Sequence, residues 1–142
     1  MKPLASLYRL ADRRNIPVCR YPMPQTGSMS VQLEDGRCYI GLDERPMLQA
    51  EERTRLAHEL GHCVTGSFYN RHTAVDSRAR HEVRADKWAI RRLISKEDLD
   101  AAVAAGHTDL YDLADYFGTT EEFVRKAVCL YIYGNVAADL YF

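Results

Sequence analysis

The sequence predicts one α+β domain in which a small antiparallel sheet packs on a mostly helical core. Short β-prone runs are confined to residues 16–42, whereas apolar residues recur at helical spacing through most of the second half. A chain of 142 residues, 46% of them apolar, can bury one respectable core and is short for two. We therefore treat residues 1–142 as a single domain, with 1–95 as a minimal core and 96–142 as a helical tail.

The first third of the chain is expected to form a helix followed by strands. Apolar residues share one face of a helix over residues 3–14. β-Prone runs follow at 16–21, 28–33 and 38–42. An aspartate-glycine pair between the last two favours a tight hairpin turn, because glycine accepts positive φ. An antiparallel hairpin is the expected result.

The chain after the strands is predicted to be helical, with helices at residues 46–66, 77–94, 96–106, 109–117 and 120–133. Pro46 suits the first turn of the first of them, since proline lacks the N–H that a first turn leaves unpaired. Ser95 with Asp98, and Thr119 with Glu122, resemble capping boxes that begin the third and the last helix.

Charge and cysteine content restrict the class of protein. The formal net charge of −1 provides no global attraction to DNA or to anionic lipid. The first fifteen residues carry charges where a signal peptide needs an apolar region, and no apolar run is long enough to span a membrane. The cysteines at positions 19, 38, 63 and 129 form no CxxC pair. We expect a cytoplasmic protein with free thiols and no membrane partner.

The stretch "RLAHELGHCVTG" at residues 55–66 suggests a metal site. On a helix His58 and His62 project only about 40° apart, and apolar residues cluster on the opposite side. Two neutral imidazoles one turn apart can bind one zinc ion, and Glu59 beside them can take the proton of a water molecule. The alternative is a surface helix with two solvated histidines.

A catalytic zinc site needs a third protein ligand, and the following helix offers two carboxylates. Glu82 and Asp86 share an otherwise apolar face. A buried carboxylate is costly unless it is paired or binds a metal, so one of them could complete the site while the other orients a ligating histidine. His81 could replace Glu82 as the third ligand, but its side chain points about 100° away from that face. The alternative is that both carboxylates form salt bridges to arginines elsewhere.

The two segments resemble those of a known family, the ImmA/IrrE-type small zinc metallopeptidases. "LAHELGH" at 56–62 is similar to the HExxH helix of that family, and "EVRADKWA" at 82–89 is similar to its glutamate helix. The order of sheet, HExxH helix, glutamate helix and helical tail also fits. The resemblance implies a zincin-like core and a gluzincin-like metallopeptidase.

Carried over residue by residue, the resemblance makes His58, His62 and Glu82 the ligands of Zn²⁺ and Glu59 the catalytic base. Asp86, one turn further on, is then the acceptor for the second ring N–H of a ligating histidine. The implied reaction is hydrolysis of a peptide bond, in which zinc polarises the carbonyl and Glu59 passes a proton from the attacking water to the leaving amine.

The sequence leaves the group that stabilises the oxyanion open. Tyr69, His72, His81 and His107 are all conceivable donors, and nothing in the sequence ranks them.

The resemblance also implies a substrate class. Family members act inside the cell, where they cleave a partner transcriptional repressor in a phage, mobile-element or stress-response setting. We therefore expect a cytoplasmic endopeptidase whose protein substrate is a helix-turn-helix regulator. The alternative is a non-catalytic, zinc-stabilised module that recognises a regulator protein or DNA. Glu59 discriminates between the peptidase and this module, because a purely structural zinc site has no need of that acid.

Residues 109–133 of the tail resemble a helix-turn-helix unit. Glu121 and Glu122 stand at the start of its second helix, where base-contacting residues would lie, and only Arg125 and Lys126 oppose their repulsion of phosphates. We expect this segment to pack on the core or recognise a regulator rather than to bind DNA.

A basic stripe, formed by Arg80, Arg84, Lys87 and Arg91, lines the far side of the glutamate helix. Its simplest interpretation is a solvated face, and the alternative is a surface that docks an acidic partner. Trp88, at the edge of the stripe, is expected to cover a neighbouring helix.

Overall fold

The computed structural model describes residues 1–69 and 72–138, so residues 139–142 of the predicted tail lie outside it. It confirms the α+β class. The elements are α1 (Leu4–Arg13), β1 (Val18–Tyr21), β2 (Ser28–Gln32), β3 (Cys38–Asp43), α2 (Gln49–Thr65), α3 (Val75–Leu93), α4 (Lys96–Ala104), α5 (Leu110–Phe117) and α6 (Glu121–Tyr133).

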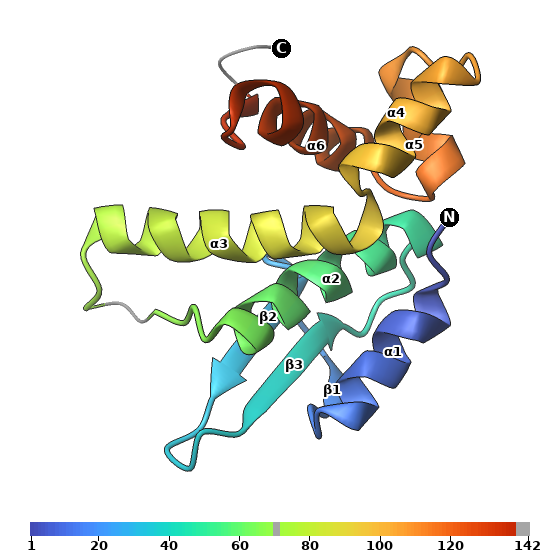
Figure 1. Cartoon of the computed structure of the whole chain (residues 1–142). Helices are drawn as coiled ribbons and strands as arrows, with labels where there is room; N and C mark the ends of the chain where they lie inside the picture. Colours follow the sequence, from blue (N-terminus) through green and yellow to red (C-terminus); the bar gives the residue numbers. More distant parts are fainter. Residues whose placement is uncertain (70–71, 139–142) are drawn as a thin grey trace.

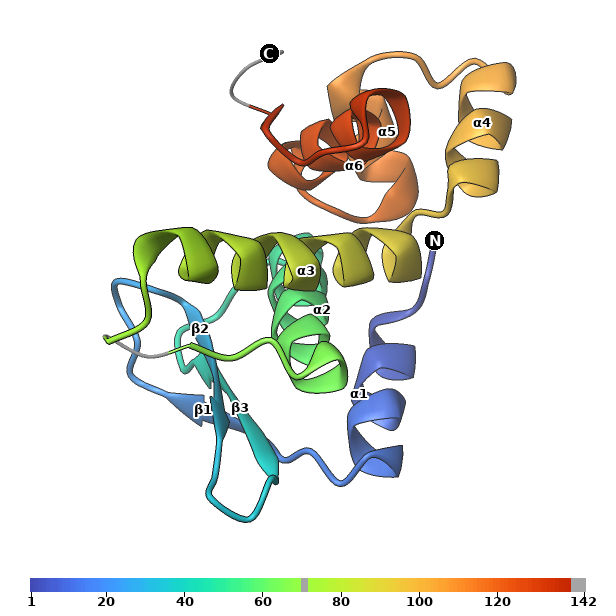
Figure 2. The same ribbon diagram turned by 60° about the vertical axis from the view of Figure 1, so that its left-hand side comes forward.

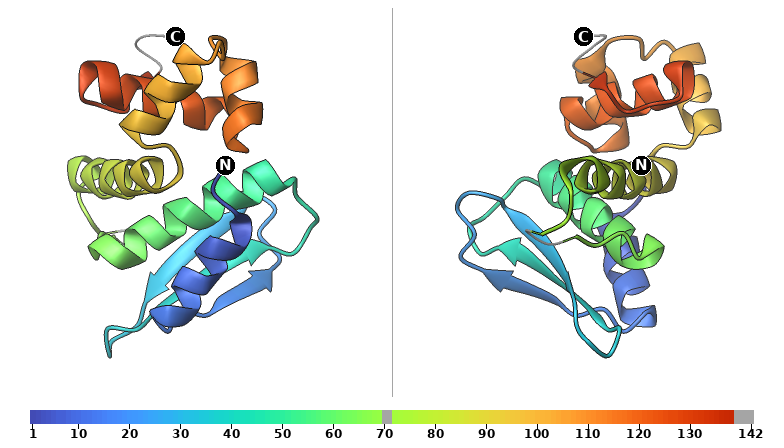
Figure 3. Two further views of the ribbon diagram at one scale, coloured as in Figure 1. Left: turned by 45° about the vertical axis from the view of Figure 1, so that its right-hand side comes forward. Right: turned by 90° about the vertical axis from the view of Figure 1, so that its left-hand side faces the viewer.

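Helix α3 lies between two parts of the molecule (Figure 1). The sheet, α1 and α2 lie on one side of it, and α4, α5 and α6 lie on the other, an arrangement that persists when the view is turned (Figure 2). Helix α2 runs along one face of the sheet beside α1 (Figure 3). The pair α2 and α3 therefore forms the centre of the fold.

The sheet is mixed, which corrects the expectation of an antiparallel one. Strands β2 and β3 form the predicted antiparallel hairpin, but β1 runs parallel to β3, and the strand order is β1-β3-β2. Strand β3 takes the central place because it is the most apolar, with Ile40 and Leu42 almost fully buried. Insertion of β3 between two strands of opposite direction makes one of its pairings parallel.

Helices α2 and α3 approach each other closely at Gly61. A Cβ at this position would lie 2.6 Å from the carbonyl oxygen of Ala85, so only glycine fits. Leu56 and Leu60 of α2 and Ile90 of α3 are fully buried in the shared core. This contact brings the predicted ligand helices together.

The start of α2 differs from the prediction. The helix begins at Gln49, with Leu48 as its N-cap, so Pro46 lies before the helix rather than in its first turn. Proline at that position restricts the residue before it to extended backbone, which is consistent with a loop between β3 and α2.

The cap of α6 is Thr120 and not Thr119. The Thr120 hydroxyl accepts a hydrogen bond from the N–H of Phe123, whereas the N–H of Thr119 donates to Ala114 and completes the end of α5. Thr119 therefore belongs to the end of α5, and Thr120 begins α6. The Ser95 cap of α4 is confirmed, since its hydroxyl accepts from the N–H of Asp98.

The expectation of free cysteines is wrong for two of the four. Cys38 of β3 and Cys63 of α2 form a disulfide with a Cα–Cα distance of 6.0 Å, while Cys19 and Cys129 are free. The pairing could not be read from the sequence, because it depends on the packing of α2 against the sheet. The cysteine content therefore no longer supports a reducing compartment.

None of the helices in the described residues is both long and apolar enough to cross a bilayer.

Candidate metal centre

Three predicted ligands converge between α2 and α3. The candidate ligand atoms of His58, His62 and Glu82 all lie within 4.8 Å of one another. His58 Nε2 lies 2.8 Å from Glu82 Oε2, His62 Nε2 lies 3.2 Å from Glu82 Oε1, and the two Nε2 atoms are 3.2 Å apart. Tetrahedral ligands with bonds of about 2.0 Å to a zinc ion stand roughly 3.3 Å apart, so this spacing fits one metal ion.

The second ring nitrogen of each histidine is held by an acceptor. His58 Nδ1 lies 2.8 Å from Asp86 Oδ1, and His62 Nδ1 bonds to the backbone carbonyl of Ser67. A proton on each Nδ1 leaves a lone pair on each Nε2, and both lone pairs then face the Glu82 carboxylate. Two lone pairs and an anion at one point repel each other unless a cation lies among them. The donor set therefore fits a metal.

The titration of these groups reflects the same geometry. Burial lowers the pKa of His58, but hydrogen bonds to Asp86 and Glu82 outweigh it and raise the pKa to about 10. Burial raises the pKa of Glu82, but hydrogen bonds from His58, His62 and Tyr69 outweigh it and hold that pKa far below its usual range. The pocket thus favours positive charge beside the carboxylate, either from protons or from a metal.

Glu59 lies beside the cluster and is 6% exposed. Its Oε2 accepts a hydrogen bond of 2.7 Å from the hydroxyl of Ser28, at the start of β2. The side chain is therefore held between α2 and the edge of the sheet. Ser28 was not identified from the sequence, because nothing local indicates that β2 packs against this turn of α2.

Of the four residues considered as oxyanion donors, Tyr69 lies at the cluster. Its hydroxyl donates to Glu82 Oε1 at 2.7 Å, and this bond together with burial raises its pKa to about 12. The rings of Tyr69 and His81 stack with a centroid distance of 6.2 Å. His107 instead bonds Asp112 Oδ2, and His72 does not line the cleft described below.

Asp86 has a second partner that the sequence did not reveal. Lys126 of α6 places its Nζ 3.3 Å from Asp86 Oδ2, while Asp86 Oδ1 faces His58. The residue pattern of a single helix face cannot include a cation from a helix forty residues away. The alternative of a salt bridge thus holds for Asp86, in addition to its histidine contact, but with a lysine rather than an arginine.

A cleft of about 850 Å³ opens over the cluster. Its walls include His58, Glu59 and Glu82, residues near the start of β2, and Phe123 and Lys126 from α6. A smaller cavity of about 230 Å³ adjoins the same cluster along β2. The volume of the cleft lies in the range of small-molecule and cofactor sites.

The sheet, the paired helices and the His-His-Glu cluster with a neighbouring glutamate have the arrangement of a metal-dependent peptidase. The family of peptidases described as Peptidase_M78, IrrE N-terminal-like domain, matches residues 11–128, so the chain belongs to this family. This confirms the resemblance to ImmA/IrrE-type proteins and implies a peptidase that acts on protein. No curated protein and no solved structure matches the chain.

Proposed function

We propose that this protein is a zinc-dependent endopeptidase. The observation that carries the proposal is the convergence of His58, His62 and Glu82 on one point, with Glu59 beside them in an open cleft. A structural zinc site normally has four protein ligands and no solvent access, whereas a catalytic one has three ligands and an open position.

In the proposed mechanism the two histidines and Glu82 hold Zn²⁺, which supplies a Lewis acid for the substrate carbonyl. Glu59 takes a proton from the attacking water and delivers it to the leaving amine. The hydrogen bond from Ser28 holds the Glu59 carboxylate in place for both transfers. Asp86 keeps the His58 proton on Nδ1, which leaves Nε2 available as a ligand.

Tyr69 is proposed as the donor that stabilises the oxyanion. Its hydroxyl donates to Glu82 at the edge of the cluster, and the residue is 42% exposed. Rotation of an exposed side chain costs little, so the hydroxyl can be redirected to a substrate oxygen. Such a donor is worth a large factor in turnover because it acts where charge develops.

An extended peptide is the substrate that best fits the cleft. Within the described part of the chain β2 is an edge strand, paired with β3 on one side only, and its residues Ser28, Met29 and Ser30 line the smaller cavity. An edge strand offers unpaired N–H and C=O groups to which an extended chain can add. A substrate that pairs in this way would pass Glu59 and the zinc ligands.

We further propose that residues 1–142 act as one unit, in which 1–95 is the core and 96–142 completes the cleft. Thr120, Phe123 and Lys126 of the helix-turn-helix-like segment 109–133 line the cleft. This placement supports a role of the segment in substrate recognition rather than in binding DNA.

The proposed substrate is a helix-turn-helix repressor inside the cell, in a phage, mobile-element or stress-response setting. Family membership supports a protein substrate. The identity of the regulator and the cytoplasmic location rest on the resemblance of the two motif segments alone.

The central test compares wild type with Glu59→Gln. Both are assayed for zinc by plasma mass spectrometry and for cleavage of a quenched-fluorescent peptide library and of candidate helix-turn-helix repressors. We expect about one zinc per chain in both proteins, and cleavage by wild type alone. Equal cleavage by both would exclude Glu59 as the base, and zinc retained without cleavage by either would favour the non-catalytic binding module.

A second test separates ligand from supporting residue. His58→Ala and Glu82→Ala should lose most of the zinc, whereas Asp86→Ala should retain the metal with an affinity lowered roughly 10- to 100-fold. The opposite order for the two acids would mean that their roles are reversed.

A further inference from the structure

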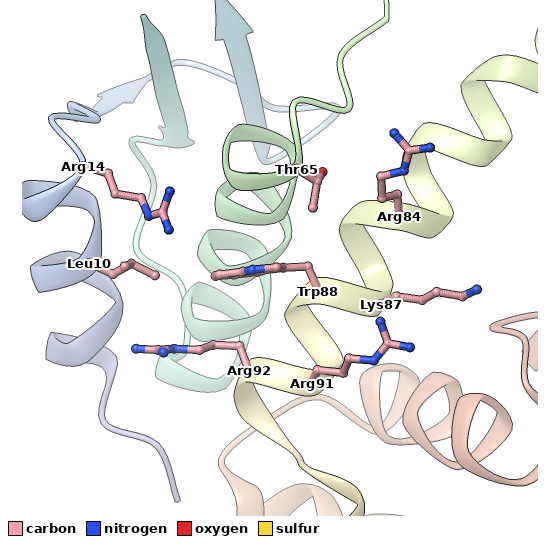
Figure 4. A pocket seen from close by; sticks show the side chains of 8 residues that line it. All are labelled: Leu10, Arg14, Thr65, Arg84, Lys87, Trp88, Arg91 and Arg92. Carbon is pink, nitrogen blue, oxygen red and sulfur yellow. The ribbon is translucent and has the colours of Figure 1, made fainter.

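A second cavity lies on the other side of α3 from the metal cleft, and no described residue lines both. It measures about 440 Å³ and is formed by α1, the end of α2 and α3 (Figure 4). Among the described residues that line it none is acidic, and five are cationic, namely Arg14, Arg84, Lys87, Arg91 and Arg92.

The five cations are not neutralised by the protein. Among residues 1–69 and 72–138, none of them has an ion-pair partner. Elsewhere on the surface arginines carry acidic partners, such as Arg20 with Glu52 and Arg55 with Glu51. Positive charge therefore accumulates at this cavity in a chain whose formal net charge is −1.

Helix dipoles explain only part of this charge. Arg14 is the C-cap of α1, and Arg91 and Arg92 lie in the last turn of α3, where cations offset the partial negative charge of the helix end. Arg84 and Lys87 lie in the interior of α3 and gain nothing from the dipole. An anionic partner would account for their presence.

The cavity has an apolar floor between its charges. Figure 4 shows Trp88 reaching across α2 toward Leu10, while Arg92 extends in the same direction toward α1. Lys87 and Arg91 extend in the opposite direction to Trp88, and Arg84 points toward the top of the view. Trp88 is half-buried and packs against the core, which confirms that it covers a neighbouring helix.

The spread of the cations indicates an extended ligand. From position 84 to position 92 the axis of α3 rises roughly 12 Å, at about 1.5 Å per residue. A single phosphate cannot contact charges so far apart, whereas an extended peptide covers this length with about four residues. Carboxylates on such a segment would meet the arginines, and an apolar side chain between them would lie on Trp88 and Leu10. Tryptophan and arginine are also the residues most enriched in interface hot spots.

We propose that this basic cavity is a docking site for an acidic segment of a partner protein. The acidic side chains pair with the cations of α3 and α1, and one apolar side chain packs on the Trp88 floor. The site does not depend on zinc or on cleavage, so a chain with Glu59→Gln binds the segment as well as wild type does.

The test uses the intrinsic fluorescence of Trp88, which is the one tryptophan of the sequence and therefore reports on the cavity directly. The probe is a short synthetic peptide in which glutamates flank a central leucine. Its affinity is measured for full-length wild type, for the double variant Arg84→Glu with Arg91→Glu, and for Arg37→Glu as a control on the distant β2–β3 turn. Both pocket positions are exposed, and circular dichroism verifies that the variants are folded.

We expect saturable binding by wild type, a loss of at least about tenfold in the double variant, and a change of less than about twofold in the control. Binding should weaken as salt is raised. A matched peptide with glutamine for glutamate should not bind.

Each opposite result overturns the proposal. Equal binding by all three proteins, or by the glutamine peptide, would remove the role of the cations. Binding of tripolyphosphate or of a single-stranded oligonucleotide in place of the peptide would assign the cavity to a phosphate ligand or to nucleic acid instead. No binding of the acidic peptide at low salt would leave the cations as a solvated surface.

Discussion

Substitution of Gly61 by alanine tests whether the contact between α2 and α3 sets the geometry of the metal centre. The new Cβ would lie 2.6 Å from the Ala85 carbonyl oxygen and 3.0 Å from its Cα, both of which are backbone atoms that cannot rotate away. Restoration of normal contact distances of about 3.5 Å requires the helices to separate by roughly half an ångström or more. Glu82 lies one turn before Ala85, so its carboxylate moves away from the histidines of α2.

The expected cost combines two opposing effects. Overpacking a helix contact costs about 2 kcal/mol, and the better helix propensity of alanine returns about 1 kcal/mol. We therefore expect the free energy of unfolding to fall by about 1 kcal/mol and the affinity for zinc to fall at least about tenfold, since displaced ligands bind metal poorly. A purely local effect on α2 would instead stabilise the protein.

The assay is urea unfolding in the presence of a chelator, followed by competition for zinc with a chromophoric chelator. Gln49→Ala, at the exposed start of α2, is the control that changes helix propensity without a tertiary contact. Unchanged or higher stability of Gly61→Ala together with unaltered zinc affinity would refute the reasoning, because the close contact would then not position Glu82.

Further predictions concern the disulfide, the metal-free site and the oxyanion donor. Replacing Cys38 and Cys63 by serine should lower the free energy of unfolding by roughly 3 kcal/mol, as expected for a crosslink over 25 residues. Reduction of the wild-type disulfide should cause the same loss, and unchanged urea midpoints would contradict this prediction. In chelator-treated protein the raised pKa of His58 contributes stability that is full below about pH 6.5 and is lost as the pH rises toward about 10. The lowered pKa of Glu82 contributes stability that is lost on acidification, so the free energy of unfolding in urea should be greatest in mildly acidic solution. Constant stability between neutral pH and pH 9 would argue against the contribution of His58. Tyr69→Phe should lower kcat roughly 100-fold with little change in KM or zinc content, and a selective rise in KM would instead indicate a role in substrate binding.

Much of the candidate site was predictable because it depends on local periodicity. The four-residue spacing of His58 and His62 places them on one helix face whatever the rest of the fold is. The two carboxylates of α3 were detectable because they interrupt an apolar face, which is costly without a partner. The family resemblance favours Glu82 over Asp86 as the ligand, and the distances from Glu82 to the histidines are consistent with this.

The residues that the sequence did not indicate come from other elements. Ser28 reaches Glu59 from the edge of the sheet, and Lys126 reaches Asp86 from α6. The sequence separations of these pairs, 31 and 40 residues, leave no periodic trace. The same holds for the cavity around Trp88. Three of its cations belong to the basic stripe seen on one helix, but its apolar floor and its remaining charge also require Leu10 and Arg14, which lie on or at the end of α1.

By itself the sequence determined which segments are helices, where the imidazoles and carboxylates stand on them, and that one helix bears a basic face. These properties follow from residue periodicity and composition, which act over a few turns of chain. Only the tertiary structure decided that β3 is the central strand, that Cys38 and Cys63 are joined, and that a cleft opens over Glu59. Those outcomes depend on which faces bury one another, and burial is a property of the packed chain as a whole.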